Sequence, residues 1–176
     1  MYYGQLYIIL ISFIALAIPS HAKTIFVDDN ASAGGDGTSW ASAHKYLQDA
    51  LAGAEYGDEI WVAEGTYKPD QGAGISEGNR TASFILTDGI NLYGGFIGKE
   101  TTRTPVGSFE NTILSGEIDD NSSLWSLHVV SVNYYSKVSL NGFMITKGNA
   151  NGNGEYSEGG GVFYFGYNYK GEGGTF

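Results

Sequence analysis

From Asp58 onward the sequence consists of short apolar segments, each ended by Gly, Asn or Asp. The segments are 58–67, 83–96, 112–118, 128–132, 137–146 and 160–168. Three of them share an apolar core closed by a leucine, and these leucines, Leu92, Leu114 and Leu140, lie 22 and 26 residues apart. Spacings of about 20–45 residues are typical of repeat proteins, in which each repeat stacks on the next. With 27 Gly and 14% aromatic residues, the chain is predicted to be β-rich with many turns.

Two architectures are compatible with the segment 138–146, which contains an Asn141-Gly142 step. An antiparallel sandwich would use this step as a hairpin turn between strands of about five or six residues. A right-handed parallel β-helix, a solenoid, needs only two or three apolar residues between tight bends. We favour the β-helix because the apolar flanks are short and similar fragments recur upstream.

The β-helix makes a specific prediction for the side chains of this segment. Val138, Leu140, Phe143 and Ile145 are expected to face the interior, and Met144 to point outward. Asn141 is expected to adopt the left-handed backbone conformation that the bend requires.

The stretch 39–54 carries the one convincing helical pattern. Apolar residues recur at helical spacing, Thr38 or Ser39 can cap the N-terminus, and Gly57 follows the end. We therefore expect an N-terminal capping α-helix near 41–54 that covers the open apolar end of the first coil. The predicted organisation is a strand and capping helix over 23–56, followed by coils over 57–176.

The first 22 residues have the pattern of a secretory signal peptide. An unbroken apolar run occupies 6–18, and small residues stand at Ser20 and Ala22. The preceding residues contain no Lys or Arg, so a retained membrane anchor is the alternative, although the run is shorter than the ~20 residues of a spanning helix. The sequence thus predicts a secreted or cell-surface protein.

The charge of the chain restricts its partners. A net charge of −10 repels nucleic-acid phosphates and anionic lipid, so neither nucleic acid nor membrane insertion of the mature domain is expected. Carbohydrate and other cell-surface components remain as partners. The absence of Cys is compatible with an exported protein that does not rely on disulfides.

Several motifs together resemble a known protein family. The segments "IFVDDNASAGGDGTSWASAHKYLQDALAGAEYGDEIWVAEGTYKP", "LYGGFIGKET", "TILSGEID" and "LNGFMITKGNA" resemble the N-terminal half of bacterial exported right-handed parallel β-helix proteins. These proteins have a pectate-lyase-like fold, and many are large surface proteins of the polymorphic outer-membrane or choice-of-anchor kind. The resemblance covers nearly all of 24–165. It implies an all-β fold, and, because family members continue for many further coils, an N-terminal part or fragment of a longer protein.

Because enzymes with this fold use acidic and basic side chains in catalysis, we consider the acidic and basic residues of this chain as candidates. The candidates are Asp28-Asp29, Asp119-Asp120, Arg80 and Arg103. Each Asp pair ends a strand, where Asp commonly accepts turn hydrogen bonds, and adjacent strand residues point to opposite faces. We therefore assign no catalytic, cofactor-binding or metal-binding residue, expect both arginines to be solvated, and retain only Ca²⁺ at an Asp pair as a cofactor hypothesis.

Histidines and aromatic residues offer weaker signals. His44 is expected on the polar face of the helix, and His128 at the start of a strand. Aromatic side chains that could stack on sugar rings are Trp40, Trp61, Trp125, Tyr134, Tyr135, Tyr164, Tyr167 and Tyr169. We favour a packing role for them, with Trp61 covering neighbouring coils and Trp40 packing against the helix.

The sequence favours an exported cell-surface β-helix module with a structural, adhesive or glycan-contact role and no active site in this segment. The inserted loops 68–82 and 98–111 would present the contact surface. The alternative is the N-terminal part of a polysaccharide lyase or glycoside hydrolase whose catalytic coils lie beyond residue 176.

Overall fold

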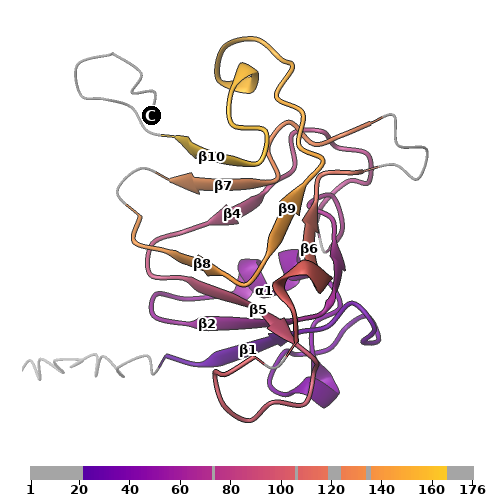
Figure 1. The fold of residues 1–176 in the computed structure, drawn as a ribbon, viewed down its shortest axis with the longest axis vertical. Helices are drawn as coiled ribbons and strands as arrows, with labels where there is room; N and C mark the ends of the chain where they lie inside the picture. Colours follow the sequence, from indigo (N-terminus) through magenta and orange to yellow (C-terminus); the bar gives the residue numbers. More distant parts are fainter. Residues whose placement is uncertain (1–21, 73, 106, 119–123, 134–135, 166–176) are drawn as a thin grey trace, which may run out of the picture.

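Three parallel sheets form the body of the molecule in the computed structural model (Figure 1), which describes residues 22–72, 74–105, 107–118, 124–133 and 136–165. Sheet A contains, in order, β1 (Thr24–Val27), β2 (Glu59–Ala63), β5 (Asn91–Phe96) and β8 (Ser139–Asn141). Sheet B contains β3 (Gly65–Tyr67), β6 (Thr112–Ser115) and β9 (Met144–Thr146). Sheet C contains β4 (Phe84–Leu86), β7 (Val130–Asn133) and β10 (Val162–Phe165).

The chain visits the three sheets in the same order three times. After β1 it runs through β2, β3 and β4, then β5, β6 and β7, then β8, β9 and β10. We call each of these passages a circuit. Asn141-Gly142 does not join antiparallel partners, because β8 pairs in parallel with β5 and β9 pairs in parallel with β6. The antiparallel sandwich is therefore wrong for this part of the chain.

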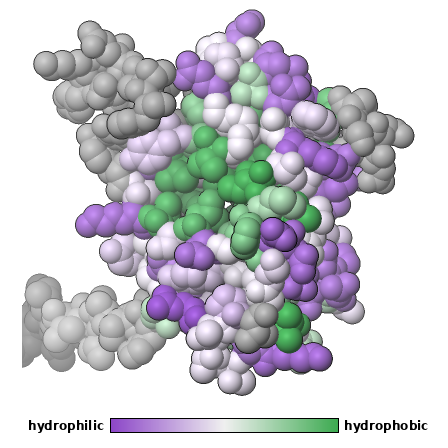
Figure 2. Space-filling model, viewed as in Figure 1, coloured by the Kyte–Doolittle hydropathy of each residue, from purple (hydrophilic) through white to green (hydrophobic). Residues whose placement is uncertain are grey.

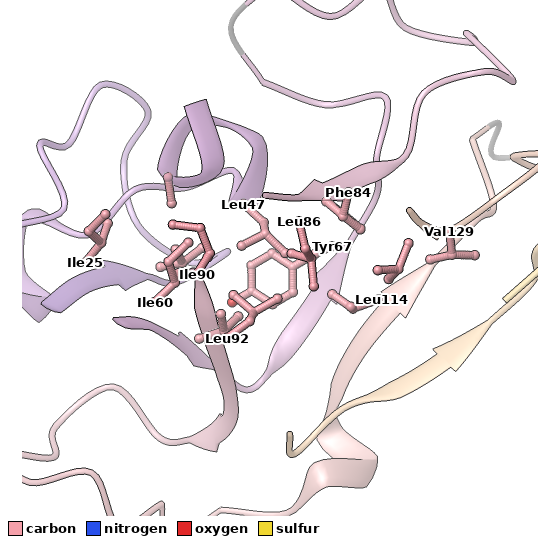
Figure 3. Packing of buried hydrophobic residues seen from close by; sticks show 14 of the residues in the cluster. Ile25, Leu47, Ile60, Tyr67, Phe84, Leu86, Ile90, Leu92, Leu114 and Val129 are labelled. Carbon is pink, nitrogen blue, oxygen red and sulfur yellow. The ribbon is translucent and has the colours of Figure 1, made fainter. Parts of the chain in front are cut away.

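Residues at equivalent positions of successive circuits stack on one another and form the core (Figure 3). In sheet A, Ile60 pairs with Leu92 and Leu92 with Leu140, and in sheet B, Tyr67, Leu114 and Ile145 form a similar row. The members of these rows in the first two circuits are buried in one cluster shared by the three sheets. Burial of this apolar surface is the main favourable term that holds the circuits together.

The segment 138–146 confirms the expected alternation. Val138, Leu140, Phe143 and Ile145 are partly buried and pack against the core, whereas Met144 is 37% exposed. The expectation for Asn141 is wrong, since the left-handed residue of this bend is Gly142, with φ of +80°. Gly adopts this conformation without the steric cost that a Cβ atom brings.

The helix is shorter than the sequence pattern predicts. Helix α1 spans Leu47–Gly53, a 3-10 turn η1 spans Trp40–Ser42, and the residues between them are not helical. His44 lies in parallel beside Val27, with its amide donating to the Phe26 carbonyl and its carbonyl accepting from the Asp28 amide. This pairing satisfies the outer edge of β1, and it prevents the helix from starting before Leu47.

Helix α1 nevertheless covers the first end of the core. It packs against β1 and β4, and its Leu47 and Ala50 side chains are buried in the core cluster. Two further 3-10 turns, η2 (Phe109–Asn111) and η3 (Gly154–Ser157), lie in loops. Residues 1–21 of the expected signal peptide lie outside the described residues.

Candidate functional site

The first acidic candidate pair, Asp28-Asp29, is engaged in backbone hydrogen bonds. Asp28 Oδ1 accepts from the Asn30 amide at 2.9 Å, and Asp29 Oδ2 accepts from the Thr66 amide at 3.0 Å. These bonds close the turn after β1 and join it to β3, as expected of Asp at a strand end. The second pair, Asp119-Asp120, lies outside the described residues.

Both arginines are bound to other residues, but only Arg80 departs from the expected solvated position, because it is partly buried whereas the Arg103 side chain is 53% exposed. Arg80 donates to the Trp125 carbonyl at 2.7 Å, to the Asn149 carbonyl at 3.3 Å and to Asn151 Oδ1 at 2.6 Å. Arg103 pairs with Glu59 at 3.2 Å, and it also donates to the Tyr93 hydroxyl at 2.9 Å. Both side chains fasten an inserted loop to residues distant in sequence.

The histidines also differ from expectation. His44 is extended beside β1 instead of lying on a helix. His128 precedes β7, is buried, and stacks on the Phe163 ring at 4.3 Å between centroids. Its Nδ1 lies 3.2 Å from the Gly159 carbonyl, so its role within the described residues is to pack the third circuit onto the second.

Aromatic residues form a second apolar layer on the face of sheet A that points away from the core. Trp61 is stacked on Phe96 at 4.9 Å and meets the Phe26 ring edge-on at 5.7 Å. Trp40 packs against Phe26 at 4.8 Å and against Phe96 at 5.8 Å, so its expected contact with the helix is wrong. The packing role of Trp61 is confirmed. Tyr134, Tyr135, Tyr167 and Tyr169 lie outside the described residues.

One hollow of about 200 Å³ lies between the turn after β1, the start of α1 and the end of β3. Its polar groups already serve the fold. The Lys45 ammonium donates to the Asp29 carbonyl, and the Tyr67 hydroxyl donates to the Ala63 carbonyl. Burial raises the pKa of the Tyr67 hydroxyl above its ordinary value, so this group stays neutral in the physiological range. The hollow is a weak candidate for ligand binding.

A second hollow of about 380 Å³ lies where the chain turns from sheet A to sheet B in the second and third circuits. We call it the Phe109 groove. Its lining residues are Gly94, Gly95, Pro105, Gly107, Phe109, Asn141, Gly142 and Phe143. The Phe109 ring is 57% exposed, and Asn141 is exposed at the end of β8. An exposed aromatic ring beside an exposed amide side chain can both stack on and hydrogen-bond to a ligand.

No side chain fills the bottom of the groove, because glycines of two circuits stack directly on one another. A Cβ atom on Gly94 would lie 2.2 Å from the Gly142 carbonyl oxygen, and one on Gly142 would lie 2.6 Å from the Gly94 oxygen. No side chain fits in either position. The two backbones therefore pack directly against each other, with Gly94 buried and Gly142 partly exposed, and the neighbouring loop forms the wall of the groove.

That wall is formed by residues 97–105 and 107–111, which belong largely to the predicted contact loop 98–111 and are fixed at three points. The Trp40 indole donates to the Glu100 carbonyl at 2.9 Å, and Arg103 is bound to Glu59 and Tyr93 as described above. Glu64 Oε1 accepts from the Ser108 amide at 3.0 Å and from the Asn111 side chain at 3.1 Å.

The hydrogen bond from the Ser108 amide lowers the pKa of Glu64 below its ordinary value, and the hydrogen bond from the Asn111 side chain adds a smaller effect in the same direction. The loop therefore holds Phe109 in place before any ligand arrives, which reduces the ordering cost of binding.

The sequence points to the loop and to Asn141, but it does not identify Phe109 or the glycine floor. The one sequence feature that could have indicated Phe109 is its position as an isolated aromatic residue in a polar insertion. That feature indicates a binding site only once the bends of two circuits are known to lie side by side. The other predicted loop, 68–82, is joined to the rest through Arg80. Within the loop, Asp70 Oδ2 accepts from the Gly78 amide at 2.9 Å.

No protein family, curated protein or solved structure matches the chain. Among the described residues, no three His, Cys, Asp or Glu side chains gather in a group that could hold a metal ion. The same part of the chain contains no helix with the length and apolar character needed to cross a membrane.

Proposed function

We propose that this chain is an exported, cell-surface right-handed parallel β-helix module whose role is to contact carbohydrate or other surface components. The observation that carries the proposal is the Phe109 groove, an exposed aromatic ring held by a fixed loop beside the exposed side chain of Asn141. The role is structural or adhesive, and turnover of the bound molecule is not part of it.

The order of the sheets supports the β-helix part of the proposal. Three successive circuits visit the parallel sheets in the order A, B, C. This order is the connectivity expected of a three-sided coil. Connections between parallel strands of one sheet are almost always right-handed, which gives the coil its hand. The apolar rows shared by adjacent circuits are the interior that such a coil requires.

The composition of the groove supports a neutral sugar as the ligand. Sugar rings present an apolar face of C–H groups and a rim of hydroxyls, and the groove offers a ring for the face and an amide for the rim. The net charge of −10 opposes acidic polysaccharides.

The test is binding of the purified chain to an array of neutral and acidic polysaccharides, followed by titration of the best ligand. Phe109→Ala is expected to raise the dissociation constant at least about tenfold, because a buried Phe ring contributes about 1.5–3 kcal/mol.

Tyr56→Ala is the matched control, since Tyr56 is an aromatic side chain that is 70% exposed and lies outside the groove. It should bind as the original chain does. Binding to no glycan, or equal loss in both variants, would contradict the proposal.

A further inference from the structure

The Asp58 carboxylate is buried beside the residue that begins the predicted mature chain. Asp58 is 1% exposed, and both of its oxygens accept hydrogen bonds from backbone amides. Oδ1 lies 2.9 Å from the Lys23 nitrogen, and Oδ2 lies 2.8 Å from the Glu55 nitrogen. The carboxylate thus joins the start of β1 to the turn between α1 and β2.

A second carboxylate with the same kind of bond shows what is unusual about Asp58. Asp88 Oδ1 accepts from the Lys137 amide at 2.7 Å, but Asp88 is exposed, so water stabilises its charge. Near Asp58, the Lys23 Nζ atom lies 3.7 Å from Oδ2, on a side chain that is 54% exposed and that also donates to the Gly53 carbonyl. Because water screens such a long surface contact, it compensates only part of the buried charge.

The Lys23 nitrogen is the atom that removal of the predicted signal peptide would change. The small residues Ser20 and Ala22 are those expected before a cleavage site that follows Ala22. Hydrolysis by a signal-removing peptidase adds water across the Ala22–Lys23 bond, with the hydroxyl going to the Ala22 carbonyl carbon and a hydrogen to the Lys23 nitrogen. Transfer of the acid proton then leaves a carboxylate on Ala22 and an ammonium group on Lys23.

The surroundings of Lys23 are compatible with such an ammonium group. The Lys23 carbonyl accepts from the Glu59 amide at 3.0 Å, so pairing with β2 fixes the residue on its other side. Ala22 and Lys23 are exposed, and the surface beside the start of β1 is mainly polar in Figure 2. An ammonium group at this position would keep part of its hydration while it faces a carboxylate that is already buried, which limits the desolvation cost of the pair.

We propose that removal of residues 1–22 creates an ion pair between the Lys23 α-ammonium group and Asp58, and that this pair fastens β1 to the body of the processed chain. The inference rests on export, which is part of the proposed function, and not on glycan binding. A charged donor in place of the amide forms a stronger hydrogen bond to the same oxygen. The processed chain is therefore more stable than a chain in which the Lys23 nitrogen remains part of a peptide bond.

The test compares two products exported by a bacterial host that expresses the full sequence, with the N-terminal residue of each identified by mass spectrometry. The original product is expected to begin at Lys23. The second carries one Ala inserted between Ala22 and Lys23, so that after processing the Lys23 nitrogen is still an amide. In denaturant titration, the unfolding equilibrium constant of the original product should be about tenfold lower than that of the product with the insertion.

Substitutions at the two carboxylates show whether the difference comes from Asp58. Asp58→Asn, introduced into both products, should abolish the difference between them, because a neutral side chain cannot form the ion pair. Asp88→Asn is the matched control, since it removes a carboxylate that accepts the backbone amide of Lys137. The difference between the two products should persist in this control.

Acylation of the Lys23 α-amine provides a second measurement that needs no variant. Only the neutral amine reacts, and pairing with a carboxylate favours the charged form. The α-amine of the folded original product should therefore react at least about tenfold more slowly than that of the same product unfolded in denaturant.

Four results would each overturn the proposal: an N-terminus other than Lys23, equal stability of the two products, a difference that survives Asp58→Asn, or an α-amine that reacts equally fast in the folded and unfolded product. The glycan array tests the proposed function separately. A product that begins at Lys23 and shows the expected stability but binds no glycan would contradict only that function.

Discussion

Individual residues at the bends decide how closely two circuits can approach. Gly142 meets two demands at once, because its φ of +80° disfavours any Cβ atom and the Gly94 carbonyl occupies the space that the atom would need. Gly34 meets only the first, with φ of +88° and no heavy atom within 4 Å of the position that a Cβ atom would take. The two positions separate backbone strain from steric contact.

Substituting both glycines tests this distinction. Gly34→Ala is expected to lower the free energy of unfolding by about 1–2 kcal/mol, the cost of a left-handed alanine. Gly142→Ala should cost at least about 1 kcal/mol more, because the backbones of β5 and the β8–β9 bend must also separate. Denaturant unfolding of both variants measures the difference, and equal losses would show that the bends are not in contact.

The Glu64 carboxylate holds the wall of the groove through its own hydrogen bonds to Ser108 and Asn111. The lowered pKa of Glu64 means that its ionised form is the one bound to Ser108 and Asn111. This stabilisation is present above the ordinary Glu pKa of about 4.3 and is lost as the pH falls through the lower folded value.

Glu64→Gln should therefore weaken the pH dependence of stability in this acidic window. As the pH falls from about 5 to about 3, the original chain is expected to lose more stability than the variant. Denaturant midpoints across that range provide the measurement. Glu110→Gln, which removes an exposed carboxylate from the same loop, should behave like the original chain.

At the level of the secondary-structure elements, the short strands are specified by alternation and stabilised by stacking. Strands of three or four residues make few hydrogen bonds of their own, so β6 and β9 depend on the rows of stacked side chains that pass through them. Leu114 stacks between Tyr67 and Ile145 on the core side, while Met144 faces outward beside Ile113.

Substituting Asp at a core-facing and at an outward-facing position should distinguish the two faces of these strands by the loss of stability that each substitution causes. Leu114→Asp is expected to prevent folding, because an ionised carboxylate in the core has no partner. Met144→Asp should change the free energy of unfolding by less than about 0.5 kcal/mol. Leu140→Asp and Phe143→Asp should fall between them, since both side chains are only partly buried where they pack against the core. Circular dichroism with denaturant titration checks the order, and comparable damage in Met144→Asp would contradict it.

Across the three circuits, long-range side-chain contacts join the loops, in addition to the stacked side chains and backbone pairing that join the strands. Arg80 leaves the loop of the first circuit and reaches Trp125 before β7 and Asn149 after β9. The guanidinium group thus spans all three circuits through carbonyl acceptors, which are matched to its fixed fork of donors.

Removing this contact should loosen the stack. Arg80→Ala is expected to lower the free energy of unfolding by about 1–3 kcal/mol, because partly buried carbonyl groups lose their donor. Arg80→Lys should not restore it, since an ammonium group cannot reach the same set of acceptors. Arg103→Ala, which breaks a surface ion pair, should cost about 1 kcal/mol or less, and thermal or denaturant unfolding distinguishes the three.

How far each feature could be predicted depended on how local its cause is. The strands, the inward residues of 138–146 and the covering role of the 39–54 region follow from periodicity within a few residues. The predicted helix start is wrong because His44 pairs with Val27, a contact that no local pattern reveals. The solvated position predicted for Arg80 is wrong for the same reason, since its acceptors lie far along the chain.

Features with a short-range cause can be read from the amino-acid order alone: the alternation of apolar residues, the glycine bends and the absence of disulfides. Which bends stack depends on contacts between circuits, and these contacts bring Phe109, Asn141 and the glycine floor together in one groove. The same holds for burial along the apolar rows, because burial of Val162 or Leu140 depends on a neighbouring circuit and not on the residue itself.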